Sequence, residues 1–189
     1  MDDILQRIYE TRCQQPSDIT LHLPRLHAAA SRPGVRVLEL GVRSGNSTAA
    51  FLAAADQHGG RVLSVDIVAP TVPAEFWDCG IWRFVKADDL TFVQDDPVDV
   101  LFIDTSHHYD HTLAELHRFH DIVAVDGCIM LHDSELRHPD GAPSTDPEYP
   151  VAEAIRRFID EVTEWQADFY SGSYGLAVLT RRGMLLGAA

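Results

Sequence analysis

The sequence predicts an α/β fold of three layers, in which a mostly parallel sheet lies between two layers of helices. Apolar segments of strand length alternate with segments of helical spacing along most of the 189 residues. Several of the strand segments end in a carboxylate, and the chain closes with two short strands around the turn Ser171-Gly172-Ser173. We therefore expect a parallel sheet that ends in an antiparallel C-terminal hairpin.

Length and composition predict one domain over residues 1–189, with a helical preamble (1–34) and an α/β core (35–181). Hydrophobic residues make up 46% and charged residues 23% of the chain, as in ordinary soluble proteins. The start of the chain lacks the pattern of a signal peptide, and no apolar run reaches membrane-spanning length. These features favour a cytoplasmic protein. The three widely spaced cysteines indicate neither a disulfide framework nor a thiolate zinc site.

The charge balance limits the class of partner. The chain has 15 basic and 29 acidic residues and a formal net charge of -14. Such an acidic chain is a poor match for nucleic acid or for an anionic membrane, so a small molecule is the expected ligand.

Two helices are expected before the sheet. Residues 2–14 and 18–30 carry apolar side chains at helical spacing, and the turn Ser31-Arg32-Pro33-Gly34 follows them. Their apolar faces could pack on the core or on a second subunit, which leaves a homodimer open.

The stretch VRVLELGVRSGNS, residues 35–47, predicts a strand, a glycine turn and the start of a helix. The strand covers Val35 to Glu39, and the helix covers Thr48 to Ala55, with Asn46 or Ser47 as its cap. A glycine turn before a helix start offers backbone N–H groups to a ligand. Because a carboxylate beside the turn would repel a pyrophosphate, Glu39 suits a cationic ligand better.

This stretch resembles the first motif of class I S-adenosylmethionine (SAM) methyltransferases. In that family the acidic residue, here Glu39, faces the amino group of the methionine moiety. The resemblance implies that Gly41, Gly45 and Ser47 belong to the cofactor site. It also implies a Rossmann-like, seven-stranded sheet, because class I methyltransferases end their alternating α/β chain in a hairpin.

Two further acids follow the next predicted strands. Residues 61–66 form a strand that ends in Asp66, where an acid can accept both ribose hydroxyls of a nucleoside; nicotinamide enzymes share this feature. Residues 81–86 form a third strand, and Asp88 follows it. The resemblance implies that Asp88 bonds the adenine amino group, but Asp88-Asp89 equally suits the start of a helix.

The fourth and fifth strands, residues 98–104 and 127–131, bring three more polar side chains to the same edge of the sheet. Asp104 ends the fourth strand, and His132 and Asp133 follow the fifth. Two carboxylates and one neutral imidazole would balance a divalent cation, and such oxygen and nitrogen ligands suit Mg, Mn or Fe.

The segments IDTSHHYDHTL (103–113) and LHDS (131–134) resemble metal-dependent small-molecule O-methyltransferases, including macrolide sugar O-methyltransferases and the cephalosporin hydroxylase-like family. The resemblance covers about residues 35–180. It implies that Asp104, His132 and Asp133 hold a metal, with Asp104 also at the cofactor, and that His107 is the general base. The family commonly has Glu or Asp where this chain has His132, so His132 could ligate the metal, orient Asp133 or touch the substrate.

Other features of the same region allow more than one interpretation. His108 could replace its neighbour His107 as the base, whereas His111, His117 and His120 are expected on the solvated face or at the end of a helix. Residues 137–149, rich in Pro, Gly and Asp, could form a substrate loop or a surface connection before a helix over 151–165.

Together these patterns predict a SAM-dependent methyltransferase that methylates a hydroxyl of a small molecule, such as a natural-product sugar, with help from a divalent metal. One alternative is a small-molecule N- or O-methyltransferase that needs no metal. A second is a non-catalytic SAM-binding accessory subunit. A nicotinamide oxidoreductase is opposed by Glu39 and by the terminal hairpin.

Overall fold

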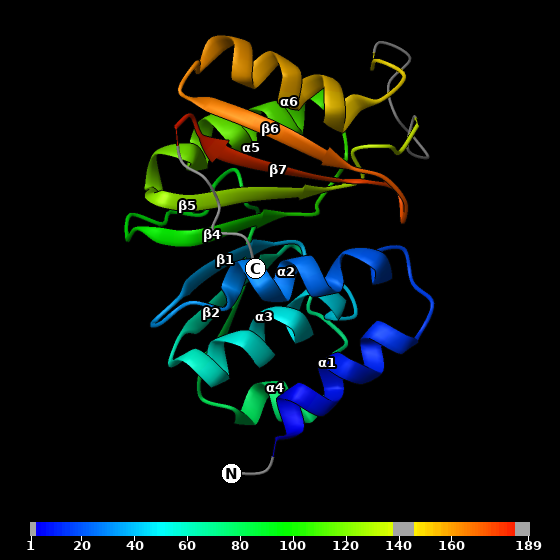
Figure 1. Cartoon of the computed structure of the whole chain (residues 1–189), viewed down its shortest axis with the longest axis vertical. Helices are drawn as coiled ribbons and strands as arrows, with labels where there is room; N and C mark the ends of the chain where they lie inside the picture. Colours follow the sequence, from blue (N-terminus) through cyan, green and yellow to red (C-terminus); the bar gives the residue numbers. More distant parts are fainter. Residues whose placement is uncertain (1–2, 138–145, 184–189) are drawn as a thin grey trace.

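The computed structural model, which describes residues 3–137 and 146–183, has the expected three layers (Figure 1). Its seven-stranded sheet has the order β3-β2-β1-β4-β5-β7-β6. The strands β1 to β5 are parallel, and β7 is antiparallel to both β5 and β6, which confirms the C-terminal hairpin. The strands are β1 (Arg36–Leu40), β2 (Arg61–Asp66), β3 (Trp82–Lys86), β4 (Val98–Ile103), β5 (Val123–His132), β6 (Trp165–Tyr170) and β7 (Leu176–Arg181).

Helices cover both faces of the sheet. Helices α1 to α4 pack on one face and α5 and α6 on the other (Figure 1). None of the helices in the described ranges is long and apolar enough to cross a membrane. The helices are α1 (Ile4–Gln14), α2 (Leu23–Ala30), α3 (Asn46–His58), α4 (Ala74–Asp78), α5 (Tyr109–Phe119) and α6 (Pro150–Glu161), with short 3₁₀ turns η1 (Thr20–His22) and η2 (His120–Ile122).

Successive residues of a strand contribute to different cores. Val37 of β1 packs in the core under α1 to α4, and its neighbour Leu38 packs in the core under α5 and α6. All six residues of β4, at the centre of the sheet, are buried. A parallel sheet with both faces covered needs such continuous apolar strands, which is why they could be recognised in the sequence.

Several element boundaries differ from the sequence-based prediction. Helix α6 ends at Glu161 and not at Trp165, because Trp165 begins β6, where its side chain is fully buried. Strand β5 begins at Val123, four residues earlier than expected. Helix α4 was not predicted, since five residues are too few to show a helical period. Most of the predicted loop over 137–149 lies outside the described residues.

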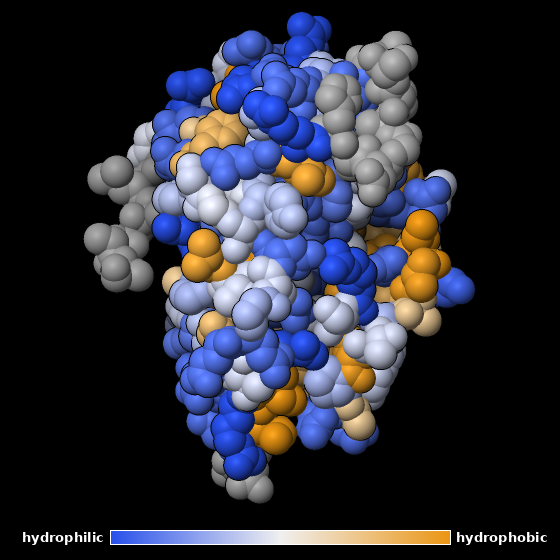
Figure 2. All heavy atoms as spheres, turned by 90° about the vertical axis from the view of Figure 1, so that its right-hand side faces the viewer, coloured by the Kyte–Doolittle hydropathy of each residue, from blue (hydrophilic) through white to orange (hydrophobic). Residues whose placement is uncertain are grey.

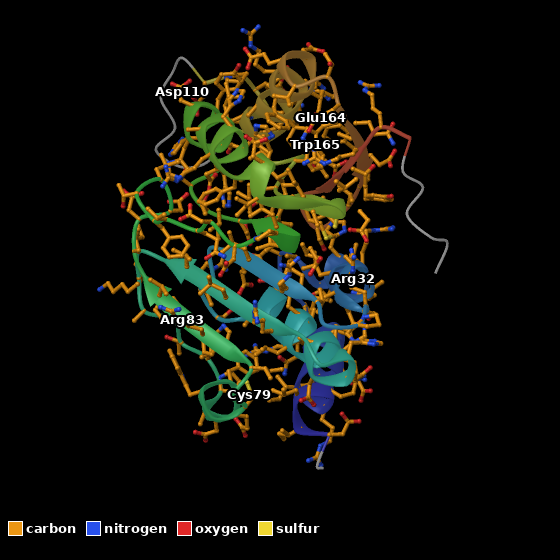
Figure 3. All side chains as sticks on the ribbon, turned by 90° about the vertical axis from the view of Figure 1, so that its left-hand side faces the viewer. Arg32, Cys79, Arg83, Asp110, Glu164 and Trp165 are labelled. Carbon is orange, nitrogen blue, oxygen red and sulfur yellow. The ribbon has the colours of Figure 1, made fainter. Side chains whose placement is uncertain are left out.

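The connection between β3 and β4 forms a turn. Residues 87–97, all of which the structure describes, contain no helix. In Figure 3, which shows β1 to β3, no helix lies in front of these strands. Asp88 Oδ1 accepts a hydrogen bond of 2.9 Å from the backbone N–H of Leu90. The alternative interpretation, in which Asp88-Asp89 starts a helix, is therefore wrong.

Gly41 brings the turn after β1 against the end of β4. Its φ is +88°, and a Cβ added to it would overlap the carbonyl oxygen of Asp104. Both the conformation and the close approach therefore require glycine. In return, the backbone N–H of Asp104 donates to the carbonyl of Leu40, at 2.9 Å.

We predict that Gly41→Ala destabilises the protein more than Gly34→Ala. Gly34 also has a positive φ, +66°, but a Cβ would meet nothing within 4 Å, so only a conformational cost of about 1–2 kcal/mol applies there. Gly41→Ala adds a backbone clash to that cost. Urea denaturation of both variants measures the difference, and equal losses of unfolding free energy would contradict the close packing of this turn.

Candidate active site

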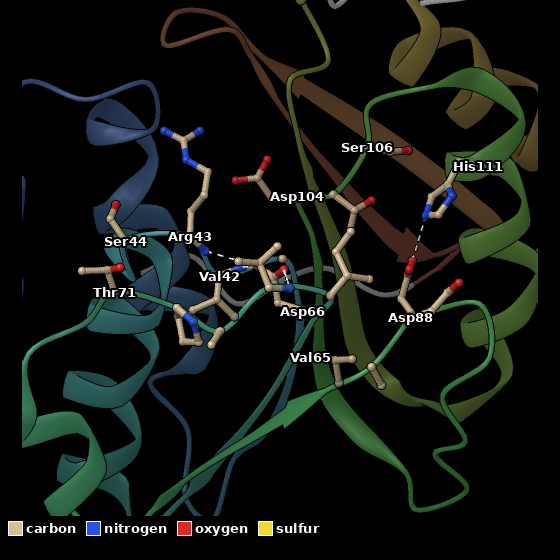
Figure 4. Close-up of a pocket in the computed structure, with 18 residues that line it drawn as sticks. Val42, Arg43, Ser44, Val65, Asp66, Thr71, Asp88, Asp104, Ser106 and His111 are labelled. Carbon is tan, nitrogen blue, oxygen red and sulfur yellow. Dashed lines mark hydrogen bonds and ion pairs between the residues drawn. The ribbon is translucent and has the colours of Figure 1, made fainter. Parts of the chain in front are cut away.

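A cavity of about 700 Å³ lies at the carboxyl ends of the parallel strands. Its position is the point between β1 and β4 where the strand order reverses, and its volume suits a small-molecule ligand. Figure 2 looks onto this side of the molecule and shows hydrophobic groups between larger hydrophilic areas. The cavity, drawn in Figure 4, is lined by Gly41–Ser44, Val65–Thr71, Ala87–Asp89, Asp104–Ser106 and His111.

Four of the residues predicted for the cofactor line this cavity, namely Gly41, Asp66, Asp88 and Asp104. Asp66 holds the neighbouring backbone in place. Its Oδ2 accepts from the N–H of Val42 at 2.8 Å, and its Oδ1 accepts from the N–H of Val68 at 2.8 Å (Figure 4). Since each carboxylate oxygen has two lone pairs, Asp66 can still accept bonds from a ligand.

Glu39, Gly45 and Ser47 are not part of the wall of this cavity. Gly45, with a φ of +73°, occupies the N-cap position of α3, and Asn46 and Ser47 lie in the first turn of the helix. The expectation that Asn46 or Ser47 caps the helix is therefore wrong. The Ser47 hydroxyl donates to Glu39 at 2.6 Å.

Glu39 is a fully buried carboxylate that joins three elements. Thr48 of α3 and Ser64 of β2 also donate to it, at 2.8 and 2.5 Å. Burial raises the pKa of Glu39 to about 7, because loss of solvation outweighs the three hydroxyl hydrogen bonds that favour its charged form. The carboxyl thereby fixes the start of α3 against β1 and β2.

Next to the cavity, Asp104, His107, His132 and Asp133 form one cluster, as the sequence predicts. His107 Nε2 lies 3.0 Å from Asp104 Oδ1 and 3.0 Å from Asp133 Oδ2. His132 Nδ1 lies 3.5 Å from Asp104 Oδ1 and 3.3 Å from Asp133 Oδ2. Both imidazoles therefore face the same pair of carboxylates.

The charges of this cluster depend on one another. Burial disfavours the charged imidazoles, but hydrogen bonds to the two carboxylates raise the pKa of His107 to about 9 and that of His132 to about 10. Conversely, burial works against the ionised carboxylates, but bonds from the imidazoles hold the pKa values of Asp104 and Asp133 below their usual range. The two carboxylates thus require positive charge beside them.

The environment of His132 suits a metal ligand. Its Nε2 lies 2.8 Å from the carbonyl oxygen of Ser173, which fixes Nε2 as a donor. In the neutral ring Nδ1 then carries the lone pair, and Nδ1 faces Asp104 and Asp133. A backbone partner on the second nitrogen is the usual arrangement for a histidine that ligates a metal. Asp104, His107 and Asp133 also offer ligand atoms within 4.8 Å of one another.

Two residues of the cluster have unusual backbone conformations. His107 has a φ of +59° and Asp133 a φ of +61°, a region that residues other than glycine seldom occupy. Such conformations cluster at functional sites. Here they bring the side chains of His107 and Asp133 within 3.0 Å of each other, beside Asp104.

The neighbouring histidines have distinct partners. His108 Nδ1 lies 3.2 Å from Asp146 Oδ2, away from the cluster, which favours His107 as the residue facing the two carboxylates. Of the two positions expected for His111, a solvated face or a helix end, the structure has the second, in the first turn of α5. There His111 lines the cavity, and its Nε2 lies 2.9 Å from Asp89 Oδ2. The four-residue spacing of His111 and Glu115 on one helix was the signal that sequence analysis missed.

Two family models match the chain. The model described as methyltransferase domain matches residues 38–134. The model described as rhamnosyl O-methyltransferase/CmcI matches residues 87–182. No protein in the curated collection of sequences matches the chain.

Solved methyltransferase structures share the fold. The SAH-bound methyltransferase PaMTH1 of Podospora anserina is 15% identical, with a TM-score of 0.65, over 96% of this chain and 88% of its own. The 1,6-didemethyltoxoflavin-N1-methyltransferase of Burkholderia thailandensis is 20% identical, with a TM-score of 0.62, over 89% and 79%. The MycE methyltransferase of the mycinamycin pathway, solved with Mg and SAH, is 17% identical, with a TM-score of 0.62, over 90% and 52%.

We predict that Glu39 makes the stability of the protein depend on pH. The pKa of its carboxyl is about 7 in the folded chain and has an ordinary value of 4.5, so the folded state binds more protons between these values. The stability that Glu39 contributes is therefore fully present below pH 4.5 and falls by up to about 3 kcal/mol as the pH rises through 7.

Urea denaturation of wild type and Glu39→Gln between about pH 4.5 and 7 isolates this contribution. As the pH rises, the unfolding free energy of the wild type should fall relative to that of Glu39→Gln. Glu10→Gln, the same change at an exposed residue of α1, serves as the control. A difference for Glu39→Gln that is constant with pH would contradict the raised pKa.

Proposed function

The chain belongs to the methyltransferase-domain and rhamnosyl O-methyltransferase/CmcI families and is a SAM-dependent methyltransferase, and from this premise we propose that it methylates a hydroxyl of a small molecule with the help of a divalent metal. The observation that carries the proposal is the convergence of two carboxylates and two imidazoles beside the cavity. The match to the rhamnosyl O-methyltransferase/CmcI model supports a sugar or another natural-product intermediate as the acceptor.

In this proposal the cavity binds SAM, which supplies a methyl group on a positively charged sulfur. Asp66 accepts hydrogen bonds from the ribose hydroxyls, and Asp88 accepts one from the adenine amino group at the far side of the cavity (Figure 4). Asp104 and the backbone at Gly41 lie at the other end. The acidic lining suits a ligand that carries positive charge.

Glu39, Gly45 and Ser47 act in the proposal through the turn. The burial of Glu39 and its three hydroxyl donors favour a positioning role, in which it fixes α3 and the glycine turn against the sheet. A direct contact between Glu39 and the methionine amino group stays a prediction from the sequence.

Asp104, Asp133 and the Nδ1 atom of His132 would hold the metal, and Mg, Mn or Fe fits this set of oxygen and nitrogen donors. When bound, the ion would lower the pKa of an acceptor hydroxyl and orient it. The Ser173 carbonyl supports His132 in this role, because it keeps the Nδ1 lone pair directed at the two carboxylates.

His107 is the proposed general base. The two carboxylates raise its pKa to about 9, and compensation of their charge by a cation removes the cause of that rise. A neutral His107 can then take the proton of the acceptor hydroxyl while the oxygen forms a bond to the methyl carbon and the bond from that carbon to sulfur breaks. The products are the methyl ether and SAH.

A metal-independent methyltransferase is the second candidate. The observation in its favour is that His107 and His132 each contact both carboxylates, at 3.0–3.5 Å, so protonated imidazoles could balance the carboxylate charge. In that case the histidines and carboxylates would orient the acceptor, and a chelator would leave the activity unchanged.

The first test of the proposal is calorimetric titration with SAM and SAH, followed by an assay of SAH release with rhamnoside and other sugar acceptors. We expect micromolar binding, which Asp66→Ala weakens at least about tenfold, because each lost hydrogen bond to a charged group is worth about 1.5–3 kcal/mol.

His107→Gln should keep SAM binding and lose turnover, whereas His108→Gln is the matched control that keeps both. SAM binding without turnover on any acceptor, with no effect of His107→Gln, would favour an accessory subunit. A failure to bind either nucleoside would contradict the proposed cavity.

The second test concerns the metal. The two carboxylates raise the pKa values of His107 and His132 to about 9 and 10, so a cation must displace protons from these imidazoles. Mg²⁺ and Mn²⁺ should therefore bind more tightly as the pH rises toward those values. Calorimetry in buffers of different ionisation heat would detect the released protons. Asp133→Asn should abolish the binding at the cluster of Asp104 and Asp133, and activity that survives a chelator would exclude the metal-assisted mechanism.

A further inference from the structure

A second cluster of acidic and histidine side chains forms the wall of the cavity near Asp88. Asp89 comes from the β3–β4 connection, and His111 and Glu115 lie one turn apart on α5. His111 Nε2 lies 2.9 Å from Asp89 Oδ2 and 3.7 Å from Glu115 Oε1, and the dashed line at His111 in Figure 4 marks the shorter contact. All three residues offer ligand atoms within 4.8 Å of one another.

Glu115 carries an unpartnered oxygen inside this cluster. The residue has 0% of its surface exposed. Its Oε1 accepts a hydrogen bond of 2.8 Å from the Thr105 hydroxyl, but its buried Oε2 has no hydrogen-bond partner in the part of the chain that the structure describes. A buried carboxylate oxygen without a donor is costly, so the site calls for a ligand that brings positive charge or a proton.

The charge count gives the same result. Asp89 has 7% of its surface exposed, and it contributes a second carboxylate beside that of Glu115. Burial, together with the neighbouring Asp89, raises the pKa of Glu115 well above its usual range. Two neighbouring carboxylates share a proton unless a cation lies between them. With a neutral imidazole, a divalent cation would make the cluster electrically neutral.

We propose that Asp89, His111 and Glu115 bind a transition-metal ion, at a site that shares no residue with the cluster of Asp104 and Asp133. The donor set is one imidazole nitrogen and two carboxylate oxygens, which suits Zn²⁺, Mn²⁺ or Fe²⁺. The spacing of His111 and Glu115 places both donors on one face of α5. Thr105, which bonds the third ligand, holds Glu115 in position.

An ion in this site links two separate parts of the cavity wall. Asp89 belongs to the helix-free connection 87–97, whereas His111 and Glu115 belong to a helix packed on the sheet. The ion therefore holds the connection against α5 and keeps Asp88 and Asp89 in the wall. This role depends on the cavity and not on the identity of the methyl acceptor.

The experiment disables the cluster of Asp104 and Asp133 and then measures metal binding at Asp89, His111 and Glu115. Asp104→Asn/Asp133→Asn, made in the full chain, is dialysed against Zn²⁺ and, separately, Mn²⁺, and the bound metal is quantified. We expect one equivalent of metal. Adding His111→Ala or Glu115→Gln should weaken its binding at least about tenfold, since even the partners of metal ligands contribute 10–100-fold to affinity.

His117→Ala is the matched control, because His117 lies on the same helix and its Nε2 contacts the carboxylate of Glu161 at 2.8 Å, outside the proposed site. It should leave the binding unchanged. The proposal is overturned if the Asp104→Asn/Asp133→Asn protein binds no metal, or if its metal is insensitive to His111→Ala and Glu115→Gln. Circular dichroism of each variant confirms that it folds.

If the Asp104→Asn/Asp133→Asn protein does not fold, the wild type and His111→Ala give the same answer. The wild type should bind two equivalents of metal and His111→Ala one, and equal stoichiometries would overturn the proposal. Methyl transfer is assayed separately. A failure of that assay would count against the proposed function, whereas the metal stoichiometry alone decides whether the site at His111 exists.

Discussion

The buried carboxyl of Glu39 is the interaction on which the cavity depends. It extends from β1 and accepts hydrogen bonds from two hydroxyls in the first turn of α3 and from one hydroxyl of β2. These bonds offset part of the cost of burying the group. They also fix the direction in which the chain leaves β1, and that direction lets Gly41 approach the backbone of Asp104. The end of β4, and with it the Asp104 cluster, is therefore positioned by a residue that does not line the cavity.

The same constraint, that a buried or half-buried carboxylate needs hydrogen-bond donors or positive charge beside it, recurs along the carboxyl edge of the sheet. Asp66 satisfies it with backbone N–H groups, Asp104 and Asp133 with two imidazoles, and Asp89 with His111. In a chain of net charge -14, positive charge is scarce, so each carboxylate needs a specific local partner. Where the partners are imidazoles, protons and a cation compete for the same lone pairs. Acids in such a setting favour metals and cationic ligands over anions.

The strands and the acids that follow them could be predicted from the sequence, because a strand buried on both faces is a continuous apolar run and its polar end is conspicuous. The face on which a side chain lies was harder to predict. Strand β1 continues to Leu40, so Glu39 lies within the strand, alternates with Leu38 and shares the face of Val37 under α3. The sequence-based prediction ended the strand at Glu39, and for that reason it placed Glu39 at the cofactor. The direction of His111 depends on how α5 rotates against the sheet, which only packing determines.

The backbone at the Asp104 cluster is strained, and the charged side chains around it offset that strain. Positive φ values at His107 and Asp133 cost about 1–2 kcal/mol each, because a Cβ crowds the backbone there. Hydrogen bonds between charged partners contribute about 1.5–3 kcal/mol each, enough to offset that cost. The imidazoles provide these bonds when no cation is present, and a cation would provide the equivalent attraction when they lose their protons. The strained conformation would therefore be stabilised in both states, and the proposed metal would bind by exchange with protons and with little rearrangement of the chain.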